Sequence, residues 1–214
     1  MNKWLALIVT LLLVSCTKDT YHYPDVKEEF FTGLANADSL LVEIITDDGV
    51  TRQVAESEKA GHIAPDSLVR LIGYYEDLSD GHVKVHSISP VISPLPVPAV
   101  QYADSVPTAP VSLQSSWLGY QHLNMVLNVM GGGRIHKIVF LEIEQTPPDA
   151  DGVAHAAISI HHDDKYDAAV YQSRAYASLP LYPYLSSSVR QLDIKLCYLD
   201  YDGSEKSVSF AYKP

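Results

Sequence analysis

Histidine and aspartate are the side chains in this chain most able to do chemistry, and several of them fall close together. Of the nine histidines, His155 and His161 share one face of an alternating apolar segment, and His162 is followed by two aspartates. A zinc site needs three or four ligands that converge tetrahedrally, and one strand cannot supply them without partners from elsewhere. Neither an HExxH nor a CxxC spacing is present. We therefore predict no metal site, and we interpret the segment around His162 as a solvated turn.

Motifs for nucleophilic catalysis and for phosphate binding are also missing from the sequence. It contains no Gly-x-Ser-x-Gly elbow. Gly131-Gly132-Gly133 lies between two predicted strands and not before a helix, so it lacks the helix N-terminus that binds phosphate. We interpret these glycines as a hairpin turn. The sequence predicts no catalytic residue, no cofactor and no enzymatic activity.

Tyrosine is the residue type whose distribution most indicates binding. Eight of the fourteen tyrosines lie in the last 50 residues of the chain. Tyrosine adds contact area at low entropic cost, so we predict an interaction surface here. Its candidate residues are Tyr166, Tyr171, Tyr182 and Tyr184. Aromatic rings also stack on sugars, and tyrosine is a good strand former in its own right, so these readings stay open beside protein binding.

The first sixteen residues have the features of a lipoprotein signal peptide. Lys3 precedes an apolar run, and Leu-Val-Ser-Cys ends it at Cys16. The run is shorter than the roughly 20 apolar residues needed to span a bilayer. We predict cleavage before Cys16, lipid modification of Cys16 with acyl chains such as palmitate, and attachment to the outer membrane, with the periplasmic or surface-exposed leaflet left open.

Charge and cysteine content limit the remaining possibilities. The formal net charge is −11, and it becomes −12 once residues 1–15 are removed with Lys3. An acidic surface repels phosphate backbones, so nucleic acid is not expected as a partner. With Cys16 assigned to lipid, Cys197 is the one remaining thiol, and no intrachain disulfide can form.

The elements that would position these residues are short β-strands. After a tether at residues 17–28, five strand-length segments separated by turn residues occupy residues 29–90, which favours a small OB-like β-barrel. Residues 91–110 are rich in proline and are interpreted as a semi-rigid connector. Seven further short strands in residues 111–214 are typical of an immunoglobulin-like β-sandwich. The predicted fold class is therefore all-β.

The order of several short motifs resembles the NigD-like lipoproteins of anaerobic gut and oral bacteria. Beside the lipobox, the motifs are Glu29-Phe30-Phe31-Thr32, Thr46-Asp47-Asp48-Gly49, Tyr74-Tyr75-Glu76, the run from Ser89 to Val97, Leu113-Gln114-Ser115-Ser116-Trp117, and Tyr120 to Asn128. The resemblance implies an OB-like domain followed by a β-sandwich, and a bacteriocin-associated or immunity role. It supplies no catalytic residues. Four positions match the family pattern with roles that are expected to be structural: Trp117, Leu123, Asn124 and His136.

Two functions follow as expectations from these observations. The first is a non-enzymatic outer-membrane lipoprotein that is anchored through Cys16 and binds another protein. The second is a glycan-binding accessory lipoprotein of the cell envelope, because the chain combines aromatic residues with an OB-like barrel.

Overall fold

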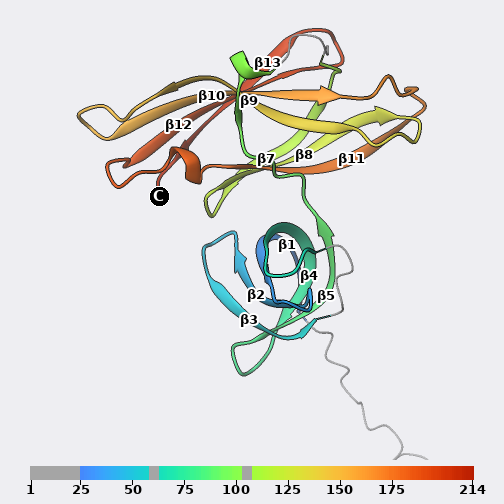
Figure 1. The fold of residues 1–214 in the computed structure, drawn as a ribbon, viewed down its shortest axis with the longest axis vertical. Coiled ribbons are helices and arrows are strands. Elements are labelled where there is room, and N and C mark those ends of the chain that lie inside the picture. The colour runs from blue at the N-terminus through green and yellow to red at the C-terminus, as the bar shows by residue number, and fades with distance from the viewer. Residues whose placement is uncertain (1–24, 58–62, 103–107) are drawn as a thin grey trace, which may run out of the picture.

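The computed structural model describes residues 25–57, 63–102 and 108–214, which form a barrel and a sandwich joined by a proline-rich segment (Figure 1). Cys16 and the predicted signal peptide and tether up to residue 24 lie outside the described residues. No helix in the described part of the chain is long and apolar enough to cross a membrane. The all-β class expected from the sequence is confirmed.

Five strands form the closed barrel, in the spatial order β1-β2-β3-β5-β4 with β4 paired back to β1. They are β1 (Val26–Ala35), β2 (Leu41–Thr46), β3 (Thr51–Ser57), β4 (Leu68–Asp77) and β5 (Val83–Pro90). All pairs are antiparallel except β3 with β5. Strand β1 begins three residues before the boundary predicted at residue 29. The predicted OB-like barrel is thus present.

Alternation within the barrel strands fills its interior with apolar side chains. Phe31, Ile44, Leu71 and Val83 are almost fully buried in one cluster. A side chain at Gly73 would meet the backbone carbonyl of Ser87, so this position in β4 has room only for glycine. Burial on this scale contributes about 1.5–3 kcal/mol for each large apolar side chain.

Two sheets form the sandwich, one of five strands in the order β13-β12-β10-β9-β6 and one of three in the order β11-β8-β7. The strands are β6 (Val97–Pro98), β7 (Ser112–Gly119), β8 (His122–Gly131), β9 (Lys137–Thr146), β10 (Val153–Asp163), β11 (Tyr171–Pro180), β12 (Gln191–Leu199) and β13 (Glu205–Tyr212). Short 3₁₀ turns occupy Ala99–Gln101 and Tyr182–Tyr184. The predicted β-sandwich is confirmed, with a parallel pairing of β10 and β12 inside it.

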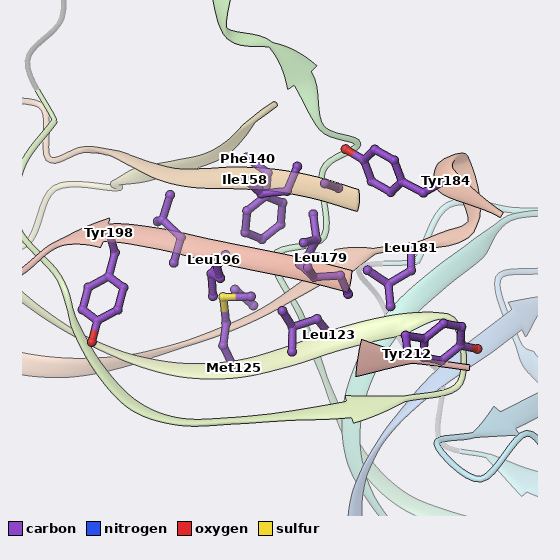
Figure 2. Close-up of a cluster of buried hydrophobic side chains, with 14 of the residues drawn as sticks. Leu123, Met125, Phe140, Ile158, Leu179, Leu181, Tyr184, Leu196, Tyr198 and Tyr212 are labelled. Carbon is purple, nitrogen blue, oxygen red and sulfur yellow. The ribbon is translucent and has the colours of Figure 1, made fainter. Parts of the chain in front are cut away.

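The sandwich core lies between the two sheets (Figure 2). Leu123 and Met125 of β8 face the side chains of the larger sheet, among them Phe140 and Leu196. These residues follow the period-two alternation of a strand with one buried face. The same core contains Tyr184, which is 6% exposed.

The proline-rich segment is attached to the sandwich. Ile92 forms a parallel bridge with Ala177 of β11, and β6 pairs with Leu141 and Glu142 of β9. The three-stranded sheet is the one that faces the barrel (Figure 1). Strands β7, β8 and β11 therefore supply the sandwich side of the junction between the domains.

Candidate interaction sites

Two loops at one end of the sandwich present a group of strongly exposed apolar side chains. We call this group the sandwich tip: Ile135 on the β8–β9 loop, and Tyr166, Val170 and Tyr171 on the β10–β11 loop and the start of β11. Their exposed fractions are 91%, 79%, 71% and 52%, respectively. Backbone bonds join the two loops, since Val170 N–H donates to the carbonyl of Gly131 at 3.1 Å. An apolar group that protrudes from adjoining loops is typical of a protein-binding surface.

Asp167 fixes the shape of the tip. One oxygen of its carboxylate accepts N–H bonds from Gly132 at 2.6 Å, Gly133 at 3.1 Å and Arg134 at 3.0 Å. These backbone donors hold the pKa of Asp167 well below its usual range. The triple-glycine turn is therefore an anion site after all, and its anion is a carboxylate of the same chain.

Backbone constraints reinforce the clamp on the tip. A Cβ at Gly132 would lie 2.8 Å from the carbonyl oxygen of Ala168, so a side chain there would push the loops apart. Lys165 and Tyr166 both have positive φ, at 57° and 55°, which places Tyr166 in a conformation that surrounding contacts must hold. Arg134 also donates to the Lys165 carbonyl at 2.6 Å. The exposed side chains are thus carried on a preorganised backbone.

His136 and His162 form a hydrogen-bonded row with Asp167 behind the tip. His136 Nε2 lies 3.2 Å from Asp167 Oδ2, and His136 Nδ1 lies 2.9 Å from His162 Nε2. Because Asp167 is ionised, the His136 Nε2–H group donates to its carboxylate. His162 Nδ1 lies 3.2 Å from the Pro110 carbonyl. An Asp–His pair activates a nucleophile only when one faces it, and here a second histidine occupies that position.

The interpretation of the His162 segment as a solvated turn is wrong. His161, His162 and Asp163 are all buried at the end of β10, and burial lowers the pKa of both histidines. His155 is separate from them and lies 3.6 Å from Asp193 on the outer sheet face. Within the described residues, no group of three or more His, Cys, Asp or Glu side chains is placed to hold a metal ion.

The predicted tyrosine surface does not form a single patch. Tyr166 and Tyr171 belong to the tip, whereas Tyr182 borders a cleft of about 300 Å³ that is also lined by Arg70 and His122 near the barrel. Tyr184 lies in the sandwich core and not on the surface, because the 3₁₀ turn at Tyr182–Tyr184 directs it inward. The apolar neighbours Ile135 and Val170 were missed, since single aliphatic residues in predicted loops carry no signal of their own.

A buried polar network joins the barrel to the sandwich. Arg70 of β4 forms an ion pair with Asp47 of the β2–β3 turn; the Arg70 side chain is almost fully buried and that of Asp47 is partly exposed. Arg70 also donates to Asn124 of β8 at 2.9 Å and to Ser178 of β11 at 3.2 Å. Burial lowers the pKa of Arg70, and Asp47 opposes that effect. The net stability that such a buried ion pair adds is small, because the desolvation of its two charges offsets their attraction.

The turn that carries Asp47 packs directly against the sandwich. Asp47 accepts from Trp117 Nε1 at 3.2 Å and from Asn124 Nδ2 at 2.6 Å. A Cβ at Gly119 would collide with the Asp47 carboxylate, so glycine there makes room for it. These contacts give Trp117 and Asn124, two positions singled out by the family pattern, a structural role. Sequence reasoning missed Arg70 and Asp47, which resembled an ordinary strand residue and an ordinary turn residue.

A cleft of about 450 Å³ opens beside this network, between the two domains. Trp117 and Tyr176 line it from the sandwich, and both pack edge-on against Phe30 of β1, at ring-centre distances of 5.1 and 5.8 Å. Glu28 and Glu29 line its barrel side. The cleft therefore combines aromatic rings with carboxylates.

Comparison with known proteins assigns the chain a family. Residues 94–212 match the model of the NigD-like C-terminal beta sandwich domain. A solved structure of a NigD-like immunity protein from Bacteroides caccae is 31% identical, with a TM-score of 0.70, and the match covers 91% of this chain and all of that one. No protein with curated annotation matches the chain.

Two more distant structures share the fold. One is a protein described as toxin-related from Parabacteroides distasonis, with 17% identity and a TM-score of 0.71, covering 88% of this chain and 94% of that one. The other is a protein of unknown function from Bacteroides vulgatus, with 18% identity and a TM-score of 0.64, covering 88% and 92%. At these identities the similarity shows the fold alone.

Proposed function

This chain belongs to the NigD-like family, and from that premise we propose that it is a non-enzymatic envelope lipoprotein that binds another protein through the sandwich tip. Its role would be bacteriocin-associated or immunity-related, in keeping with the immunity protein from Bacteroides caccae to which it is similar. The observation that carries the proposal is the tip itself, where Ile135, Tyr166, Val170 and Tyr171 protrude from two clamped loops.

Rigidity is what makes the tip suitable for binding. Exposed side chains on a mobile loop would lose conformational freedom on association, at about 0.5–1.5 kcal/mol for each ordered side chain. Here the Asp167 bonds to the turn at Gly132–Arg134 fix the backbone in advance. Tyrosine and isoleucine then supply apolar area on a preorganised surface, which is how a few residues dominate many interfaces.

Membrane attachment is part of the proposal. Cys16 would carry the lipid, and the two or three acyl chains of a bacterial lipoprotein would hold the protein stably at the outer membrane, which one chain would not. The tip would then meet its partner at the membrane surface.

Crosslinking capture tests the proposal. The full chain serves as bait against envelope and culture extracts, beside an Ile135→Ser/Tyr166→Ser variant and a Leu68→Ser/Ile143→Ser control, whose residues are also exposed but lie away from the tip. We expect one protein that is recovered with the wild type and the control and is lost with the tip variant. Equal recovery with all three baits, or no specific protein with any, would contradict the proposal.

A further inference from the structure

The interdomain cleft has features of a second site that the proposed function does not use. Its lining includes Glu28 and Glu29 of β1, Trp117 of β7, and Arg174 and Tyr176 of β11. The cleft volume of about 450 Å³ lies within the usual range for ligand sites, roughly 300–1,000 Å³. These residues come from both domains, so the site exists only while the junction holds them together.

The carboxylates of Glu28 and Glu29 are balanced only in part by the protein, because Arg70, which attracts Glu29 at longer range, is itself paired with Asp47. Glu29 accepts from the Tyr75 hydroxyl at 2.5 Å and from the Asp47 N–H at 3.2 Å, and both donors are neutral. Glu28 is exposed, and its hydrogen bond with Tyr74 raises the pKa of that tyrosine. Among the ion pairs of the described residues, none includes Glu28 or Glu29.

Charge over the whole barrel reinforces that of the cleft. Residues 25–90 contain thirteen acidic and five basic side chains, a formal charge of −8, whereas residues 108–214 contain eleven and eight, a formal charge of −3. Of the described residues, Arg174 is the one cation that lines the cleft, and Arg70 is already paired with Asp47. The barrel side of the cleft therefore attracts cations and repels anions.

The same junction shows how a guanidinium is held by these residue types. The guanidinium carbon of Arg70 lies 6.0 Å from the centre of the Phe30 ring while the group pairs with Asp47. Trp117 and Tyr176 offer further rings to the cleft, which Glu28 and Glu29 also line. A ring face with a nearby carboxylate binds arginine and lysine side chains through cation–π and charge-assisted contacts.

We propose that the cleft binds an arginine or lysine side chain of a basic partner protein, between Trp117 and the carboxylates of Glu28 and Glu29. The inference rests on the proposed protein-binding function and gives the partner a basic surface. It adds a contact on the barrel side of the molecule that is independent of the apolar tip. A neutral sugar, which could also stack on the aromatic rings, would not need the two carboxylate charges.

Fluorescence of Trp117 tests the inference without the natural partner. The full chain with Trp4→Phe has Trp117 as its only tryptophan. Hexa-arginine amide is the probe, with hexaglutamate and a neutral oligosaccharide as comparators. A Glu28→Gln/Glu29→Gln variant is matched by Glu144→Gln/Glu205→Gln, which removes two exposed carboxylates from the sandwich.

We expect hexa-arginine to change the Trp117 emission, and the cleft variant to weaken that binding by about tenfold while the matched variant changes it less than about twofold. Equal weakening by both variants would mean general attraction to an acidic protein and would overturn the site. A response to the oligosaccharide but not to hexa-arginine would overturn it in favour of a glycan. If Glu28→Gln/Glu29→Gln binds hexa-arginine as tightly as the wild type, the cleft is not the binding site. If crosslinking capture is still lost with the tip variant, the proposed function stands and only this inference fails.

Discussion

The substitution Asp47→Asn tests the junction between the domains most sharply. Asp47→Asn keeps the shape of the side chain and removes its charge, which leaves the guanidinium of Arg70 without a counter-ion. The Arg70 side chain is 3% exposed and that of Asp47 is 12% exposed, so water cannot replace the lost partner. Breaking a buried pair from one side costs about 3–5 kcal/mol, and the partial exposure of Asp47 places the expected loss near about 3 kcal/mol.

Removing the other partner should cost less. In Arg70→Met, Asp47 still accepts from Trp117 and Asn124, so we expect a loss of about 2 kcal/mol. The double variant Asp47→Asn/Arg70→Met leaves no buried charge and should lose about 2–3 kcal/mol, well short of the sum of the single losses. The non-additivity of about 2 kcal/mol is the signature of the pair.

Urea unfolding measures these losses, with Trp117 fluorescence for the junction and circular dichroism for the strands. If the junction couples the domains, fluorescence and circular dichroism report a single unfolding transition for the wild type. In Asp47→Asn, the fluorescence midpoint should fall at a lower urea concentration than the circular-dichroism midpoint. Additive single losses, or a loss below about 1 kcal/mol for Asp47→Asn, would refute the assignment of Arg70 and Asp47 as a coupled buried pair.

Three further predictions concern the tip, His122 and the anchor. Gly132→Ala should destabilise the tip by about 1–3 kcal/mol, because the new Cβ would lie 2.8 Å from the Ala168 carbonyl oxygen. Limited proteolysis should then cleave faster within residues 131–136. An unchanged cleavage rate would count against a rigid tip. Burial and the nearby Arg70 lower the pKa of His122 to about 4 in the folded protein. In the unfolded chain the histidine pKa is about 6.5, so on acidification the unfolded chain binds the proton first. The free energy of unfolding therefore falls as the pH drops from about 6.5 to about 4. For this half-buried ring we expect a loss of about 1–2 kcal/mol in urea unfolding at pH 4.5 against pH 7.5, smaller in His122→Asn; a stability that rises on acidification would contradict it. Labelled palmitate should be incorporated into the wild type and not into Cys16→Ser, which should also leave the membrane fraction, and equal labelling of the two would exclude Cys16 as the anchor.

The strands and turns could be predicted because their causes are local. Asp47-Asp48-Gly49 fixes the β2–β3 turn through a glycine with φ of 82°, and period-two alternation from Leu123 to Val129 identifies a strand with one buried face. The parallel pairing of β10 with β12 could not be predicted in this way. It depends on which strands meet after the chain crosses between sheets, and strand patterns do not encode that.

The candidate sites depend on contacts between segments that are distant in the sequence. Arg70 lies 54 residues from Asn124 and 108 residues from Ser178, so no local pattern marks it as part of a network. Asp167 and the glycine turn at residue 132 are 35 residues apart, and each alone reads as loop. Tyrosine content pointed to the tip at Tyr166 and Tyr171. It could not separate them from Tyr184, because composition does not say which ring the fold turns inward.

The affinity of the captured partner for the tip variant tests the central claim most directly. With the partner purified, its dissociation constant is measured for the wild type, for Ile135→Ser/Tyr166→Ser and for the Leu68→Ser/Ile143→Ser control. Loss of two exposed hot-spot side chains should cost at least about 2 kcal/mol, which is a weakening of about thirtyfold, while the control changes little. Equal affinities for all three proteins would show that the sandwich tip is not the binding surface.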